Sequence, residues 1–152
     1  MTRPIRLGLG LLAILILAFG SVASTSAGGP KLLDARMVGI PTGGIVLDGL
    51  TGGGAAWFLD EGKAQLFTDG RLHVEVDHLV LANGTNPIAN GRAILTCSNL
   101  PAASSPIVPF SAAGDAEVDT RITLPAHCLA PAVFFMGVLP TGAERWFAVT
   151  GS

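Results

Sequence analysis

Three carboxylates recur at every second position in the second half of the chain: Asp115, Glu117 and Asp119. Alternate side chains of a β-strand share one face, so the three would form a ladder of oxygen ligands of the kind that hard cations prefer. Neighbours at i and i+2 lie about 7 Å apart, which is too far for one ion to bind all three without help from a loop. The alternative interpretation is a solvated strand face whose charges pair with Arg121 or Arg71.

A second polar face is predicted from His73, Glu75 and Asp77, which also alternate along a strand-like segment. These residue types could hold a metal ion or transfer protons, whereas His78 falls on the opposite face in strict alternation. A general base also needs a positioned partner and a pocket, and neither is visible in the sequence. We therefore assign no catalytic residue, no cofactor and no metal site, and we keep five residues as weak metal-ligand candidates: Asp115, Glu117, Asp119, His73 and Glu75.

Common catalytic motifs are missing from the sequence. The nucleophile elbow Gly-x-Ser-x-Gly does not occur, and the glycines 52–54 are not followed by the Gly-Lys-Ser/Thr of a phosphate-binding loop. We interpret this glycine run as a loop beside a packed Trp57-Phe58 pair. The sequence thus predicts a protein that is not an enzyme, with a metal-dependent hydrolase kept as an alternative.

Cys97 and Cys128 are the only cysteines. In an oxidising compartment two cysteines are expected to form a disulfide, and closing a loop of this length should stabilise the fold by roughly 3–4 kcal/mol. The alternatives are two buried thiols or a zinc site. His127 precedes Cys128, but no Cys-x-x-Cys spacing completes a tetrahedral ligand set.

The predicted disulfide also constrains the path of the chain. Cys97 ends one predicted strand and Cys128 follows the next, so a simple hairpin would place the two cysteines at opposite ends, about 25 Å apart. A disulfide requires Cα atoms about 5.5 Å apart. We therefore predict that residues 98–114 run back across the domain and that the two strands run in the same sense.

Two aromatic pairs, Trp57-Phe58 and Trp146-Phe147, occur in a chain that lacks tyrosine. Adjacent strand residues point to opposite faces, so at most one residue of each pair need lie in the core. The four residues are a candidate interaction surface for a protein or a glycan. We favour packing in the core and keep the interaction surface as the alternative.

The elements that would carry these residues are short strands. Period-2 alternation on both sides of Asp69-Gly70 predicts a β-hairpin, and the segment from Ala116 to Leu124 alternates in the same way. Glycine and proline interrupt the remaining chain too often for helices. We predict an all-β, two-layer β-sandwich of about eight strands with Greek-key, immunoglobulin-like connections. Further strands are expected at 35–40, 45–47, 56–59, 92–97, 132–138 and 145–150, and residues 100–109 are expected to be turn-like.

The first residues predict export. Arg3 and Arg6 precede an apolar run from Leu7 to Phe19, and small residues follow, which is the pattern of a secretory signal peptide. We expect cleavage after Ala23 or Ala27 and assign residues 1–27 to the signal peptide and 28–152 to the β-sandwich domain. An uncleaved anchor is the alternative.

Without that leader the chain keeps seven basic and eleven acidic side chains, a formal charge of −4. This balance argues against nucleic acid as a partner, because phosphate binding relies on Lys and Arg.

Several stretches resemble a family of small secreted bacterial proteins that have paired cysteines and no established activity. They are Gly62–Leu81, Arg92–Cys97, Gly114–Asp119, Leu124–Pro131 and Arg145–Gly151. The resemblance implies an exported disulfide-bonded domain and transfers no catalytic residue.

We expect a non-catalytic binding module, secreted or held at the cell envelope, with no membrane span after cleavage. Its partner would be a protein, a glycan or an envelope component. A structural or self-associating envelope protein is the alternative.

Overall fold

The computed structural model describes residues 29–151, which form thirteen β-strands and no helix. The predicted signal peptide, residues 1–27, lies outside the described residues. The strands are β1 (Lys31–Gly39), β2 (Val46–Leu47), β3 (Leu50–Thr51), β4 (Trp57–Phe58), β5 (Glu61–Phe67), β6 (Arg71–Asp77), β7 (Val80–Leu81), β8 (Asn90–Cys97), β9 (Leu100–Ser104), β10 (Val108–Pro109), β11 (Ala116–Arg121), β12 (Ala132–Val138) and β13 (Glu144–Thr150). The predicted all-β class is confirmed.

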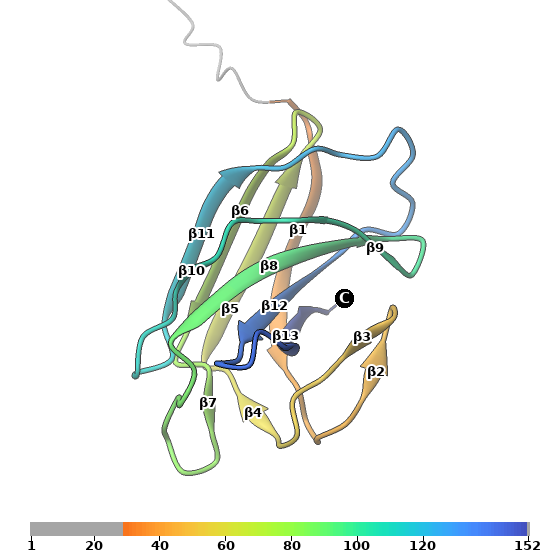
Figure 1. Cartoon of the computed structure of the whole chain (residues 1–152). Helices are drawn as coiled ribbons and strands as arrows, with labels where there is room; N and C mark the ends of the chain where they lie inside the picture. Colours follow the sequence, from red (N-terminus) through yellow and green to blue (C-terminus); the bar gives the residue numbers. More distant parts are fainter. Residues whose placement is uncertain (1–28, 152) are drawn as a thin grey trace, which may run out of the picture.

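One nine-stranded antiparallel sheet makes up most of the domain, in the order β10-β8-β12-β13-β1-β5-β6-β11, with β9 also paired to β8. Strand β1 turns the corner of this sheet. Its first part, up to Arg36, pairs with β5, and its last part, from Met37, pairs with β13. The sheet curls so far that the end strands β10 and β11 lie against each other. Figure 1 shows β8 crossing in front of β1 and β5. The strand order does not confirm the predicted Greek-key, immunoglobulin-like connections.

The core lies between the two curled halves. In β5, β6 and β11 the alternation predicted from the sequence is obeyed, because Leu66, Val74 and Val118 are buried while their neighbours are exposed or half-buried. Burying such side chains is the main source of stability of a small β domain, at about 1.5–3 kcal/mol each. The hairpin β5–β6 turns at Gly70, whose φ of 84° suits a residue without a side chain.

Strands β12 and β13 are buried on both faces, which simple alternation does not explain. The β2–β3 hairpin covers their outer face. The indole Nε1 of Trp146 donates a hydrogen bond to the carbonyl of Leu50 at 3.2 Å, and the Thr96 hydroxyl donates to Asp48 at 2.7 Å. Both Phe134 and Phe135 are consequently fully buried, one on each face of β12.

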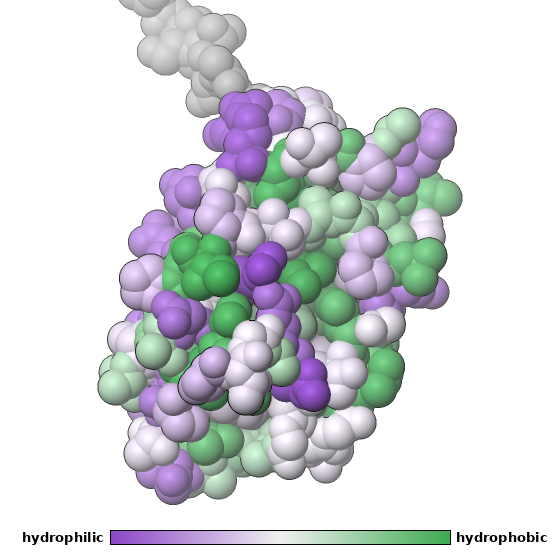
Figure 2. Space-filling model, viewed as in Figure 1, coloured by the Kyte–Doolittle hydropathy of each residue, from purple (hydrophilic) through white to green (hydrophobic). Residues whose placement is uncertain are grey.

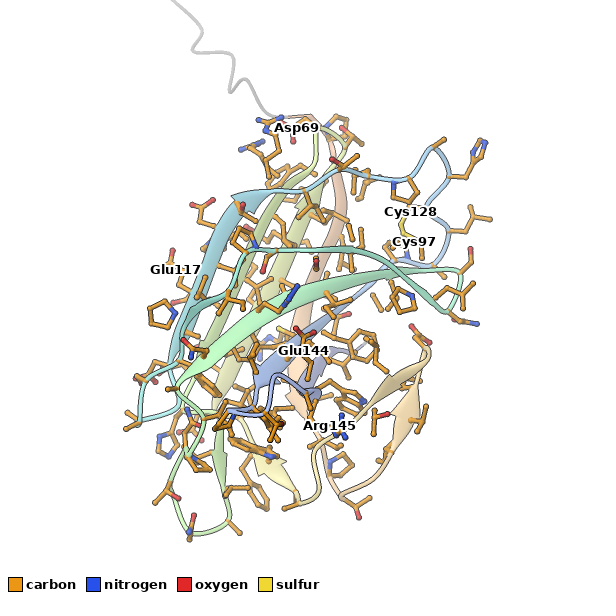
Figure 3. All side chains as sticks on the ribbon, viewed as in Figure 1. Asp69, Cys97, Glu117, Cys128, Glu144 and Arg145 are labelled. Atoms are coloured by element: carbon orange, nitrogen blue, oxygen red, sulfur yellow. A yellow bond between two sulfur atoms is a disulfide. The ribbon has the colours of Figure 1, made fainter. Side chains whose placement is uncertain are left out.

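Cys97 and Cys128 form the predicted disulfide, with their Cα atoms 4.9 Å apart (Figure 3). Strands β9 and β10 run back antiparallel along β8. Between β8 and β11 the sheet contains an even number of antiparallel pairings, through β12, β13, β1, β5 and β6, so β11 runs in the same sense as β8. The prediction drawn from the disulfide is therefore confirmed.

The expectation that residues 100–109 are turn-like is wrong, because they contain β9 and β10. Pro101 and Pro109 fit these strands since each strand forms a backbone ladder only with β8, so a missing amide hydrogen on the other side breaks no ladder.

Candidate functional site

An apolar pocket of about 220 Å³ lies at the end of the domain where β4 and β7 pair. We call it the apolar pocket. Its walls come from four separate segments: β4 with the loop before it, the β7–β8 region, the β12–β13 turn and β13. The lining residues are Gly53, Gly54, Ala55, Trp57, Leu81, Ile88, Leu139, Arg145 and Phe147. Only Arg145 among them carries a charge.

Two stacked rings form part of the pocket wall. The rings of Trp57 and Phe147 are 3.9 Å apart between centroids and their planes differ by 13°. Phe110 lies behind Trp57, with 6.4 Å between ring centroids. Aromatic stacking adds about 0.5–1.5 kcal/mol to the burial of the rings, so this part of the pocket is held rigidly.

The glycines before β4 allow the backbone to approach these rings. A Cβ atom at Gly53 would lie 3.0 Å from the Phe147 ring, and one at Gly52 would overlap Ile40. Gly53 also donates its amide hydrogen to the carbonyl of Trp146. Gly52 and Gly53 therefore allow close packing beside Trp57, as interpreted from the sequence, whereas Phe58 is 56% exposed and is not part of that packing.

Arg145 supplies a positive charge beside the apolar lining. Its guanidinium donates to the neighbouring carbonyl of Glu144 at 2.8 Å, and within residues 29–151 it forms no ion pair. The Glu144 carboxylate instead forms an ion pair with the guanidinium of Arg92, at 2.8 Å. Figure 3 labels Glu144 near the middle of the domain and Arg145 below it. The charge of Arg145 is thus available to an anionic group.

The four aromatic candidates do not form one surface. Trp57 is 5% exposed, Phe147 3% and Trp146 2%, whereas Phe58 is 56% exposed. The three buried residues are packed in the core, as the core interpretation of the sequence expects, and a shared contact surface for all four stays a prediction. Two of them, Trp57 and Phe147, nevertheless line the apolar pocket.

The metal-ligand candidates separate into two groups on the outer face of β6 and β11. His73, Glu117 and Asp119 come together, with one potential ligand atom from each lying within 4.8 Å of the others. Glu75 lies directly opposite Glu117 in the strand register. Asp115 precedes β11 and does not join this cluster, so the predicted ladder loses its first member.

Asp115 pairs with Asp77 instead. It accepts hydrogen bonds from the backbone amide of His78 at 3.0 Å and from the Ser111 hydroxyl at 3.1 Å, and the amide of His78 is the main reason that the pKa of Asp115 is lowered. The pKa of Asp77 is raised, first by its hydrogen bond with Asp115 and then by burial and the surrounding carboxylates. His78 lies just beyond β6 with a φ of 54°, so it does not continue the alternation.

The arginines expected to neutralise the carboxylate ladder point elsewhere. Arg71 and Arg121 both pair with Asp69 in the β5–β6 turn, at 3.0 and 3.4 Å. Figure 3 shows Asp69 at the top of the domain and Glu117 lower, on the left. The predicted pairing of these arginines with the ladder is therefore wrong.

The fold and these sites define a disulfide-bonded, all-β domain with a curled antiparallel sheet. Comparisons with protein-family models, with curated proteins and with solved structures each found no match to this chain. The resemblance to secreted bacterial proteins of unknown function stays a prediction. Residues 29–151 contain no helix with the length and apolar character needed to cross a bilayer.

Proposed function

We propose that this chain is an exported, non-catalytic binding module whose apolar pocket holds a small apolar group that carries a neighbouring carboxylate. The observation that carries the proposal is the apolar pocket itself, whose lining includes both the stacked rings of Trp57 and Phe147 and the charged residue Arg145. Ligand sites typically combine an apolar lining with a few polar groups that fix the orientation of the ligand. Export is supported by the disulfide and by the signal-like residues that precede the domain.

The size of the pocket limits what enters it. Pockets that enclose a whole drug-sized ligand measure about 300–1,000 Å³, and this one is smaller. It suits a single aromatic ring or a short aliphatic segment, inserted as an anchor by a larger partner. A glycan would present mainly hydroxyl groups to an apolar lining, so a protein or a lipid-like envelope component fits this chemistry better.

Phenylacetate is a direct probe, because it joins one aromatic ring to one carboxylate. We expect saturable binding, measured by calorimetry or by tryptophan fluorescence. Gly54→Leu should abolish binding by filling the pocket, since a Cβ atom at Gly54 meets no atom within 4 Å and the fold should tolerate it. Phenylacetamide, which lacks the charge, should bind more weakly than phenylacetate.

Arg145→Gln tests the role of the charge. We expect phenylacetate affinity to fall roughly three- to tenfold, which corresponds to about 0.7–1.4 kcal/mol for one partly exposed charge pair. Arg36→Gln is the matched control, because Arg36 is exposed on β1 and does not line the pocket. Equal affinities for all these variants would contradict the proposal.

Self-association is a second candidate function, and the open edge of β9 favours it. This strand pairs only with β8, and Leu100 at its start is 65% exposed. Open edges with apolar side chains promote pairing between chains. Figure 2 shows hydrophobic residues among hydrophilic ones on this face. Light scattering at micromolar concentration, with Leu100→Lys as the comparison, would separate an oligomer from a monomer.

A further inference from the structure

The outer face of β6 and β11 presents one histidine and two carboxylates from positions that the sheet fixes. His73 of β6 lies directly opposite Asp119 of β11, and Glu117 precedes Asp119 by two residues on the same face. The inward-facing neighbours Val74 and Val118 are buried in the core, which fixes both strands. The three side chains therefore project from a rigid framework.

The distances between the potential ligand atoms of this cluster are close to those between the ligand atoms of a bound ion. The three potential ligand atoms lie within 4.8 Å of one another, and Nδ1 of His73 is 3.9 Å from Oε1 of Glu117. In a tetrahedral zinc site, with bonds of about 2.0–2.2 Å, ligand atoms lie about 3.3–3.6 Å apart. The Glu117 side chain is 66% exposed, so a small rotation can close the difference without moving the backbone.

The charge of this face is not balanced by cations. Glu117 and Glu75 oppose each other in the register, and like charges at such positions destabilise a sheet. Arg71 and Arg121 pair with Asp69, and Lys63 lies 3.5 Å from Asp34. Within the described part of the chain, neither Glu117 nor Asp119 pairs with a lysine or an arginine. A bound cation would relieve this repulsion.

We propose that His73, Glu117 and Asp119 form a surface site for one divalent transition-metal ion of the zinc class. Imidazole nitrogen selects such ions over Mg²⁺ and Ca²⁺, which prefer sites made only of oxygen ligands. Three protein ligands leave one tetrahedral position open to water or to a donor group of another molecule. This site lies on the outer face of the sheet and shares no residue with the apolar pocket, so it is independent of the proposed function.

Isothermal titration of the untagged protein with Zn²⁺ tests the site. We expect one Zn²⁺ per chain, a shift of the His73 imidazole resonances on binding, and at least tenfold weaker binding of Mg²⁺. His73→Ala should weaken Zn²⁺ binding at least tenfold, and Glu117→Gln and Asp119→Asn should each weaken it. His127→Ala, which removes an exposed histidine from the loop before Cys128, should bind Zn²⁺ like the parent protein.

Thermal melts without metal establish that the variants fold, because all three side chains lie on the surface and the core is unchanged. Added Zn²⁺ should raise the melting temperature of the parent protein and of His127→Ala, and leave that of His73→Ala unchanged. Three results would overturn the proposal: no saturable Zn²⁺ binding, an unchanged affinity in His73→Ala, or Mg²⁺ binding as tight as that of Zn²⁺, which would indicate a merely acidic surface.

Discussion

The indole of Trp57 stacks on the phenyl ring of Phe147 with 3.9 Å between centroids, although the two residues come from strands far apart in the sequence, β4 and β13. Trp57 belongs to the short strand β4, which pairs with β7, and Phe147 belongs to the central strand β13. This one contact both closes an end of the core and forms the rigid part of the apolar pocket.

A double-mutant cycle should detect the stacking energy. Trp57→Leu and Phe147→Leu each remove a buried aromatic ring, and we expect each to destabilise the fold by about 2–4 kcal/mol. The double variant should lose less than the sum, with a coupling of about 0.5–1.5 kcal/mol, because the stack is lost only once. Urea unfolding monitored by circular dichroism measures all four species. Strictly additive losses would show that the two rings do not interact.

Gly137 should not tolerate a side chain. A Cβ atom there would overlap the ring of Phe147, which the stack with Trp57 prevents from moving away. We expect Gly137→Ala to destabilise the domain by about 1–3 kcal/mol through overpacking. Gly54→Ala is the matched control, since its Cβ would meet open space, and it should change stability by less than about 0.5 kcal/mol. Equal losses in the two variants would contradict this packing.

Removal of the disulfide should destabilise the fold, because the closed loop restricts the conformations of the unfolded chain. The two cysteines are 31 residues apart, so Cys97→Ser with Cys128→Ser should lower the free energy of unfolding by roughly 3–4 kcal/mol. Loss of the disulfide acts mainly on the unfolded state, so the native strand content seen by circular dichroism should persist at low temperature. An unchanged denaturation midpoint for the double variant would be incompatible with the observed link between β8 and the segment after β11.

Asp77 should destabilise the native state at neutral pH. Its pKa is raised in the fold because it shares a hydrogen bond with Asp115, so ionising both carboxyls is unfavourable. A carboxyl whose folded pKa lies above its unfolded value lowers stability once the pH exceeds both values. Asp77→Asn should therefore raise the melting temperature at pH 7, and the gain should fade as the pH drops below about 4.

Asp34 is a matched reference, because its pKa is shifted in the opposite direction to that of Asp77. Hydrogen bonds from Lys31 and Gln65 lower the pKa of Asp34 to about 2. A lowered pKa contributes stability above the unfolded value near 3.8, and this contribution is lost as the pH falls through about 2. Asp34→Asn should therefore lower the melting temperature at pH 7 and have little effect near pH 2. The same sign of pH dependence for Asp77→Asn and Asp34→Asn would contradict these assignments.

Local patterns were sufficient to predict much of the fold. The hairpin around Gly70, the inward side of β11 at Val118 and the strand that contains Phe134 follow from alternation and turn residues, which depend only on neighbours in sequence. The disulfide followed from the cysteine count and the expected compartment. Strands β9 and β10 were missed because prolines usually exclude central strands, whereas these strands lie at edges.

The pocket could not be predicted from the sequence, because it depends on which distant segments meet. Nothing near Ile88 or Leu139 indicates that these residues share a pocket with Trp57.

The burial of both Trp146 and Phe147 also breaks the alternation rule. The register between β12 and β13 shifts between Phe135 and Met136, where Phe147 has no partner, and the β2–β3 hairpin covers the face that alternation would expose. The pairing of Arg71 with Asp69 was equally hidden, since it depends on the geometry of the turn.

The most direct test of the binding role is an NMR measurement of contacts between phenylacetate and the isotope-labelled protein. The account predicts nuclear Overhauser effects from the phenyl protons of the probe to the rings of Trp57 and Phe147 and to the methyl groups of Ile88, all lost in Gly54→Leu. Contacts confined to the exposed ring of Phe58, or no contacts at probe concentrations that saturate binding, would contradict it.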